Sequence, residues 1–433
     1  MQGRFGDILA FLSGSLLPLA YAPYALFPIA VLSPALLIIL WQNVTPRRAF
    51  WRGLLYGTGL FGVGVSWVHI SFHQFGGIPL VGAIPLTALF VVGMALYLAL
   101  LGGGLACFFP KNTPLKLWLV LPAAWTLVEW LRGWFLTGFP WLSLGYSQID
   151  SPLNGFAPLL GVYGITWLTI LTAALLVFIF NYLKGFIQTK VWTPNQISQT
   201  QVWTPHQTQI WISLVLLIAI WGSGWYLAGI AWTQPVHQPK QIVLIQGNIP
   251  QDFKWSSGYQ LPSMERYLQL SQAHHDADII IWPETAVPLF YHDVSKYIPD
   301  FFEQLMTMPE KASFLIGIPV MYPDGSYFNS VAKIASQPSF YYKRHLVPFG
   351  EYIPFQSLFG NFFQLLKIPM AEFSAGDEGQ LNLNSAGESI GVSICYEDVF
   401  GELIRSSLPT ATLLVNISND AWFGDSIAPH QHL

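Results

Sequence analysis

The sequence predicts a multispan α-helical membrane bundle followed by an α/β domain, and two features of its composition support this. Of the 433 residues, 53% are hydrophobic and only 10% are charged, whereas about 25% are charged in an ordinary soluble domain. Residues 1–232 hold 9 Lys and Arg against 3 Asp and Glu, and residues 233–433 hold 10 against 20. Their net charges, +6 and −10, sum to the −4 of the chain. The chain therefore divides into an apolar domain over 1–232 and an acidic domain over 233–433, and neither has the charge expected of a nucleic-acid-binding protein.

Seven segments of the first domain are apolar enough to be membrane-spanning helices. A bilayer core about 30 Å thick requires about 20 mostly apolar residues per helix. Residues 7–41 form a proline-containing apolar run that is too long for one helix, so we divide it into two spans near residues 21–28. The other five spans are expected at 50–72, 78–109, 115–135, 159–183 and 210–232.

The positive charges of the short loops predict how these spans are oriented, because Lys and Arg are enriched in the cytoplasmic loops of membrane proteins. With the N-terminus in the cytoplasm, the cytoplasmic side receives nearly all of them: Arg4, Arg47, Arg48, Arg52, Lys111, Lys116, Lys184 and Lys190. Seven spans then place the second domain outside the cytoplasm. The first span is expected to be an uncleaved anchor, since no cleavage site follows it.

Arg132 is the exception, and it lies three residues after Glu129 at the outer end of the fifth predicted span. The two side chains could pair with each other, because residues three apart share one face of a helix. Arg132 could instead contact a lipid phosphate or extend toward the membrane surface. We favour the last interpretation, since long basic side chains near the end of a span usually reach for water in this way.

The second domain alternates short β-rich runs with turn-rich or helical segments, as layered α/β folds do. A helix is expected at 261–277. Strands are expected at 241–249, 279–282, 314–320, 330–334, 339–343, 389–395 and 412–417. Three of these strands lead into residues with reactive side chains, namely Glu284, Lys343 and Cys395. Strand ends are where layered α/β folds usually carry their functional groups.

Cys395 is a candidate nucleophile. It closes an apolar strand and is followed at once by polar residues 396–398, which predicts a tight turn that presents the thiol. The other cysteine, Cys107, lies on the opposite side of the predicted membrane, so the two cannot form a disulfide. A thiol nucleophile needs a base and a donor for the oxyanion of a tetrahedral intermediate, roles that Glu284 and Lys343 could fill. The alternative is a buried structural cysteine beside an ordinary ion pair.

Three motifs around these residues resemble the catalytic motifs of the nitrilase superfamily. They lie at 282–284 (Trp-Pro-Glu), at 342–352 (beginning Tyr-Lys-Arg-His) and at 394–397 (Ile-Cys-Tyr-Glu). In detail they resemble the motifs of the apolipoprotein N-acyltransferases, which are bacterial inner-membrane enzymes. The resemblance continues at 138–146, 246–250 and 416–424, and so it covers nearly the whole chain.

The resemblance implies both the fold and the site of the second domain. The fold would be a nitrilase-like α-β-β-α sandwich, and Glu284, Lys343 and Cys395 would be its catalytic triad. Four further residues would support the triad or bind substrate: Glu351, Trp255, Tyr396 and Glu397. Of these, Glu351 would assist Lys343. For Trp255, an exposed loop aromatic without a role is an equal alternative.

The resemblance also implies the reaction. Family members transfer a fatty acyl chain from a phospholipid, typically phosphatidylethanolamine, to the N-terminal amine of a diacylglyceryl-cysteine apolipoprotein. A cysteine thioester carries the acyl chain, and the step completes lipoprotein maturation on the periplasmic side of the inner membrane. No cofactor is expected. No metal is expected either, because His69 and His73 have the spacing of a ligand pair but no third ligand near them.

Two other functions remain open at this point. A membrane-tethered amidohydrolase would use the same triad, with water in place of the lipoprotein amine. An inactive scaffold is the second alternative, because the family pattern continues past Leu433 through further strands to a last transmembrane helix, and we expect the sandwich to be C-terminally incomplete. The intact Glu284, Lys343 and Cys395 argue against the scaffold, and the few ionisable residues in the spans argue against a transporter.

Overall fold

The computed structural model describes residues 3–192, 205–236, 238–256, 258–274, 276–307, 312–352 and 372–433. The chain forms two compact units. The helical unit comprises residues 1–69, 80–233 and 425–433, and the α/β unit comprises residues 70–79 and 234–424.

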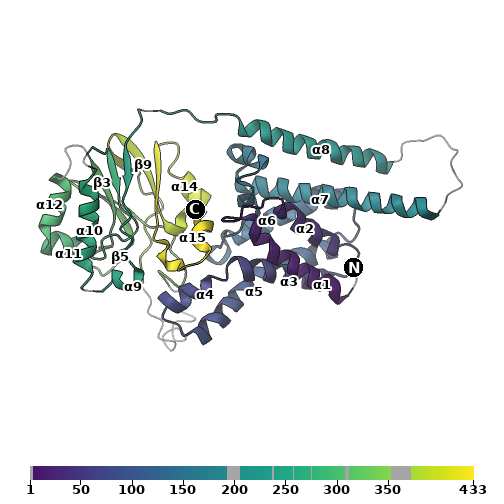
Figure 1. The fold of residues 1–433 in the computed structure, drawn as a ribbon, viewed down its shortest axis with the longest axis horizontal. Coiled ribbons are helices and arrows are strands. Elements are labelled where there is room, and N and C mark those ends of the chain that lie inside the picture. Colours follow the sequence, from purple (N-terminus) through teal and green to yellow (C-terminus); the bar gives the residue numbers. More distant parts are fainter. Residues whose placement is uncertain are drawn as a thin grey trace. The chain divides into compact units, whose positions relative to one another are not determined.

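Each of the seven predicted spans contains a helix. The helices are α1 (Arg4–Leu16), α2 (Ile29–Leu40), α3 (Pro46–Gly64), α5 (Leu80–Phe108), α6 (Leu121–Arg132), α7 (Ala157–Trp192) and α8 (Pro205–Ala228) (Figure 1). Between α1 and α2 the chain forms a 3-10 turn and then turns without regular structure, at the place where residues 7–41 were divided.

Three helical stretches of the described residues are long and apolar enough to cross a membrane, which makes this a membrane protein. They are Leu80–Phe108, Pro152–Lys184 and Gln207–Ala228, and a fourth is possible if Pro46–Gly64 and Val68–Phe75, bent by 59°, form one span. By contrast α1, α2 and α6 have only 13, 12 and 12 residues, fewer than the roughly 20 that a full crossing needs. Seven spans therefore remain a prediction.

Arg132 does not extend toward the membrane surface, so that interpretation was wrong. Its side chain is buried and its Nη1 donates to the carbonyl oxygens of Phe139 and Trp141, at 2.5 and 2.6 Å. Glu129 is buried as well, and its carboxylate accepts hydrogen bonds from Trp125 Nε1, Thr166 Oγ1 and the Leu144 backbone. The two charges thus hold the loop over residues 139–144, which folds back onto α6.

Replacing Arg132 with Ala should therefore destabilise the helical unit. The change removes the donor from the buried carbonyl group of Trp141 and the partly buried one of Phe139, and a buried polar group left unsatisfied costs about 1–3 kcal/mol. We expect the detergent-solubilised variant to unfold at a clearly lower temperature than the wild type. Arg47→Ala, which changes an exposed arginine at the start of α3, is the control. Equal unfolding temperatures for the two variants would contradict the buried role of Arg132.

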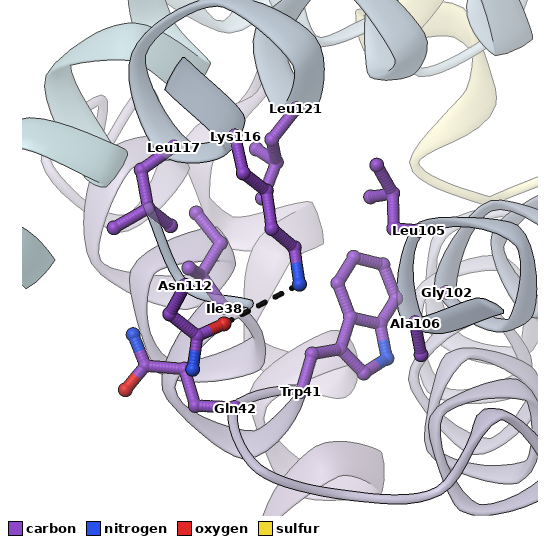
Figure 2. Close-up of a pocket in the computed structure, with 10 residues that line it drawn as sticks. All are labelled: Ile38, Trp41, Gln42, Gly102, Leu105, Ala106, Asn112, Lys116, Leu117 and Leu121. Carbon is purple, nitrogen blue, oxygen red and sulfur yellow. Dashed lines mark hydrogen bonds between the residues drawn. The ribbon is translucent and has the colours of Figure 1, made fainter. Parts of the chain in front are cut away.

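A second buried cation of the helical unit, Lys116, lines a small cavity (Figure 2). Its Nζ donates to Asn112 Oδ1 at 3.3 Å, and the indole of Trp41 lies across from it. The cavity encloses about 10 Å³, which is the least that holds one water molecule. We therefore assign it to the packing of the helices.

The α/β unit contains two main sheets. The first is five-stranded in the order β1 (Ile242–Leu244), β2 (Ile279–Ile281), β3 (Ser313–Gly317), β6 (Ser330–Ile334) and β7 (Ser339–Tyr342). The strands β1, β2 and β3 are parallel, and β6 and β7 continue the sheet antiparallel. The second sheet has the order β10 (Leu413–Ile417), β9 (Glu388–Ile394) and β8 (Leu383–Ser385). A short pair, β4 (Val320–Met321) and β5 (Tyr327–Phe328), lies beside them.

Helices cover the first sheet, as the alternating pattern predicted. Figure 1 shows α10 (Gln260–Gln272), α11 (Tyr291–Tyr297) and α12 (Pro299–Thr307) on one side of it. In the second sheet, α14 (Gly401–Arg405) connects β9 to β10. The indole of Trp282 is fully buried beneath the helices of the first sheet, stacked on Tyr267 at 5.1 Å. This packing fixes the end of β2, and with it the residues that follow.

Candidate active site

Cys395 lies at a sharp turn between β9 and the 3-10 helix Cys395–Val399. Its φ of +53° is in the left-handed region, which a residue with a side chain seldom adopts outside tight turns and functional sites. The carboxylate of Glu397 is fully buried and holds this turn. It accepts hydrogen bonds from the backbone N–H groups of Ile394 (2.8 Å), Arg344 (2.6 Å) and His345 (3.0 Å) and from the Tyr341 hydroxyl (2.9 Å).

Glu284 follows β2 and is also buried, with both carboxylate oxygens in hydrogen bonds. Its Oε1 accepts from Asn329 Nδ2 at 2.7 Å, and its Oε2 accepts from the backbone N–H of Asn419 at 3.0 Å. The next residue, Thr285, has a φ of +48°. Glu284 and Cys395 thus both lie at turns that contain a residue with a positive φ.

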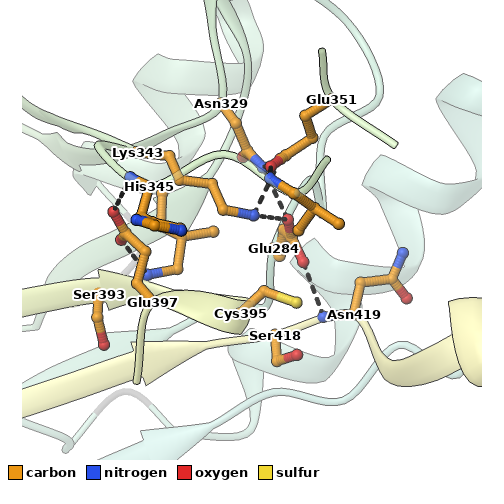
Figure 3. A network of polar contacts seen from close by, with 12 residues as sticks. Glu284, Asn329, Lys343, His345, Glu351, Ser393, Cys395, Glu397, Ser418 and Asn419 are labelled. Carbon is orange, nitrogen blue, oxygen red and sulfur yellow. Dashed lines mark hydrogen bonds and ion pairs between the residues drawn. The ribbon is translucent and has the colours of Figure 1, made fainter. Parts of the chain in front are cut away.

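Lys343 follows β7, and its ammonium bridges two carboxylates. The Nζ lies 2.9 Å from Glu351 Oε1 and 3.7 Å from Glu284 Oε1, and the side chain is only 1% exposed. Asn329 Nδ2 joins the same pair, since it also donates to Glu351 Oε1 at 2.9 Å. Figure 3 shows Glu284, Lys343 and Cys395 converging from three strand ends. The structure therefore brings together the three residues that the sequence singled out.

The charge state of this cluster follows from its burial. Burial raises the pKa of the Cys395 thiol well above its ordinary value, and the charge of Glu284 adds to this effect. Lys343 and a hydrogen bond from Ser418 oppose it without cancelling it. At neutral pH the site therefore holds a thiol, and a base must remove its proton when it reacts.

Lys343 stays positively charged. Burial by itself would lower its pKa, but Glu351 and then Glu284 raise the pKa well above the ordinary value of a lysine. An ammonium that keeps its charge in a water-poor site is suited to stabilise a developing oxyanion. This arrangement fits the predicted assistance of Lys343 by Glu351.

The other predicted supporting residues have different surroundings. The Tyr396 ring is buried and packs edge-on against Phe400 at 5.1 Å. Trp255 is half exposed, at the end of α9 (Gln251–Lys254). Its predicted contact with substrate stays a prediction.

Four residues of the site were not singled out from the sequence. Asn329 and Asn419 hold the Glu284 carboxylate, Ser418 contacts the Cys395 thiol, and Lys254 donates from Nζ to the main-chain carbonyl of Glu284 at 3.0 Å. Burial lowers the pKa of Lys254 to about 8, and Glu284 partly offsets the shift. Asn419 and Ser418 lie in the recognised motif at 416–424, whereas Asn329 and Lys254 carried no sequence signal.

Gly317, the last residue of β3, lets the Glu284 turn pack closely. A Cβ at this position would lie 2.2 Å from the Pro283 carbonyl oxygen and 2.8 Å from Glu284 Cα. Gly317→Ala must displace the backbone of the turn, and overpacking of this kind costs about 1–3 kcal/mol. We expect lower thermal stability and slower chemistry at Cys395. Gly401→Ala, at the start of α14 with open space around it, is the control, and equal reactivity of the two variants would contradict the prediction.

A helical membrane unit joined to an α/β unit with Glu, Lys and Cys at three strand ends defines a membrane-bound member of the carbon-nitrogen hydrolase class. Two family models match: "Apolipoprotein N-acyltransferase N-terminal domain" over residues 13–175 and "Carbon-nitrogen hydrolase" over residues 241–433. The chain belongs to the apolipoprotein N-acyltransferase family and is an acyltransferase.

Curated relatives match along nearly the whole chain. The apolipoprotein N-acyltransferase of Methylococcus capsulatus is 39% identical over 428 residues, which are 98% of this chain and 80% of that protein. The apolipoprotein N-acyltransferase of Nitrosomonas europaea is 40% identical over 439 residues, covering 100% of this chain and 82% of that protein. A solved carbon-nitrogen hydrolase from Helicobacter pylori G27 is 16% identical over 41% of this chain and 59% of its own, with a TM-score of 0.30, too low to compare folds.

Proposed function

We propose that the protein transfers a fatty acyl chain from a phospholipid to the N-terminal amine of a diacylglyceryl-cysteine apolipoprotein, through a thioester on Cys395. Glu284 is the general base and Lys343 stabilises the oxyanion. The observation that carries this proposal is the convergence of these three side chains in one buried site, with the Lys343 ammonium 3.7 Å from the Glu284 carboxylate.

The first half-reaction acylates the enzyme. Glu284 takes the proton of the Cys395 thiol as Sγ attacks the ester carbonyl carbon of the phospholipid. The carbonyl oxygen becomes an oxyanion that Lys343 stabilises. When the C–O ester bond breaks, the lysophospholipid oxygen takes the proton from Glu284, and the acyl chain remains on Cys395 as a thioester.

The second half-reaction transfers the chain. The neutral N-terminal amine of the apolipoprotein attacks the thioester carbonyl, and Glu284 takes a proton from the attacking nitrogen. The C–S bond breaks, an amide forms and the proton returns to sulfur, which regenerates the thiol. Cys395 is uncharged both as the thiol and as the thioester. Both states suit a buried position, where burial raises the pKa of the thiol.

We further propose that the enzyme lies in the bacterial inner membrane with its α/β unit on the periplasmic side. The distribution of Lys and Arg in the loops supports this orientation. Both substrates carry acyl chains, so a membrane-spanning unit lets them reach the enzyme without crossing water. Phosphatidylethanolamine is the proposed donor, on the strength of the family resemblance.

The test is the mass of the Cys395 peptide after incubation of the protein with phosphatidylethanolamine in detergent, without acceptor. We expect a fatty-acyl adduct that is discharged by a diacylglyceryl-cysteine peptide, which becomes N-acylated. Cys107→Ser, at the other cysteine, which is exposed, should behave like the wild type. An adduct lost to water with no preference for the amine would favour an amidohydrolase, and a folded protein that never forms one would contradict the proposal.

A further inference from the structure

Lys254, at the C-terminal end of the short helix α9, is a buried cation without an assigned role. The side chain is 7% exposed, and its Nζ donates to the main-chain carbonyl oxygen of Glu284 at 3.0 Å. Burying an ammonium is expensive unless it is paired or hydrogen-bonded. An apolar side chain at this position would avoid the free-energy cost of burying a charge. The lysine therefore indicates that its hydrogen bond to Glu284 has a role in the site.

The first residue of the same helix, Gln251, is linked to Glu284 through Asn419. Gln251 Oε1 accepts a hydrogen bond from Asn419 Nδ2 at 2.8 Å. The backbone N–H of Asn419 in turn donates to Glu284 Oε2 at 3.0 Å. One helical turn therefore holds the main chain of Glu284 directly and its carboxylate through a single intermediate residue.

The Glu284 turn needs such support. Thr285, the next residue, has a φ of +48°, and a residue with a side chain persists in this region only when its surroundings hold it there. A general base must also stay within hydrogen-bond reach of the proton it takes, and a displacement of about 1 Å lowers a rate by about 10²-fold.

We infer that α9 (Gln251–Lys254) is a positioning element for the catalytic base, with Lys254 fixing the Glu284 peptide and Gln251 fixing the carboxylate through Asn419. This inference rests on the proposed role of Glu284 as the base. Lys254 acts through Glu284 and is a positioning residue.

The experiment measures single-turnover acylation of Cys395 by phosphatidylethanolamine in detergent at several lipid concentrations. Lys254→Met should lower the maximal acylation rate about 10- to 100-fold and leave the half-saturating lipid concentration unchanged. Lys254→Arg, which keeps a charged donor, should recover part of the rate. The matched control is Lys240→Met, because Lys240 Nζ also donates to a main-chain carbonyl, that of Ala386 at 2.9 Å.

Gln251→Ala tests the contact with the carboxylate through Asn419 and should lower the maximal acylation rate in the same way. In a Glu284→Gln background, Lys254→Met should cause no further loss, since it acts through Glu284. An unchanged acylation rate in folded Lys254→Met, or a loss that Lys254→Arg does not recover at all, would overturn the inference. If Cys395 is acylated at the normal rate in Glu284→Gln, the assignment of Glu284 as the base is wrong. If the rate is normal only in Lys254→Met, Glu284 remains the base and only the positioning role of Lys254 fails.

Discussion

Replacing Glu284 with Gln is expected to slow acylation of Cys395 at pH 7 by about 10²- to 10⁴-fold, the range that a general base usually contributes. Burial holds the thiol pKa above its ordinary value, so almost no thiolate exists at neutral pH. The proton must therefore leave during the attack on the ester. Gln keeps the volume of the side chain and an oxygen that can accept from Asn329 or Asn419, but it cannot take the proton.

The residual rate of this variant should rise with pH. Without a base, the reaction depends on thiolate formed at equilibrium, which increases about tenfold per pH unit below the thiol pKa. Glu284 is the second cause of the raised thiol pKa, so its removal lowers that pKa in part, while burial keeps it elevated. Single-turnover acylation followed by the mass of the Cys395 peptide provides the measurement. Glu303→Gln, on the exposed side of α12, is the control, and a residual rate independent of pH would argue against general base catalysis by Glu284.

The strands that carry the site could be predicted because they are buried. All three residues of β2 are buried, as are nearly all of β9. In the sequence β2 is therefore an apolar run, and β9 is Ile390, Val392 and Ile394 alternating with small residues. The strands β5 and β8 were missed, since β5 has only two residues and β8 has a single apolar residue, Leu383. Elements this short carry too few side chains for a pattern.

The two asparagines that hold the Glu284 carboxylate could not be predicted, because Glu284 is distant from them in the sequence. Asn329 and Asn419 bind Glu284 across 45 and 135 residues, and a single Asn between two strands is equally typical of a turn. Arg132 was misinterpreted for the same reason. Its position at the end of a span favoured the surface, and only the loop that folds back over it supplies the buried carbonyl partners.

Replacing Lys343 with Met is expected to have the largest effect on stability, lowering the free energy of unfolding at pH 7 by about 3–5 kcal/mol, as found when one partner of a buried ion pair is removed. Met matches the length of the lysine stem but leaves Glu284 and Glu351 buried without their common cation, which lies 3.7 and 2.9 Å from them in the wild type. Acylation of Cys395 should be lost as well, since the oxyanion has no cation. Lys333→Met, at a partly exposed lysine of β6, is the control.

A second substitution distinguishes this electrostatic cause from lost packing. In the wild type the pKa of Lys343 is raised on folding, so its stabilisation is fully present below the ordinary lysine pKa of 10.5 and is lost only above it. In the variant the two buried carboxylates face each other without a cation, and their repulsion destabilises the folded state. Lys343→Met with Glu351→Gln should recover part of the loss at pH 7, because one of the two charges is gone. Equal stability of the single and double variants would mean that repulsion between the two carboxylates does not cause the loss, and the proposal of a fixed ammonium for the oxyanion would then fail.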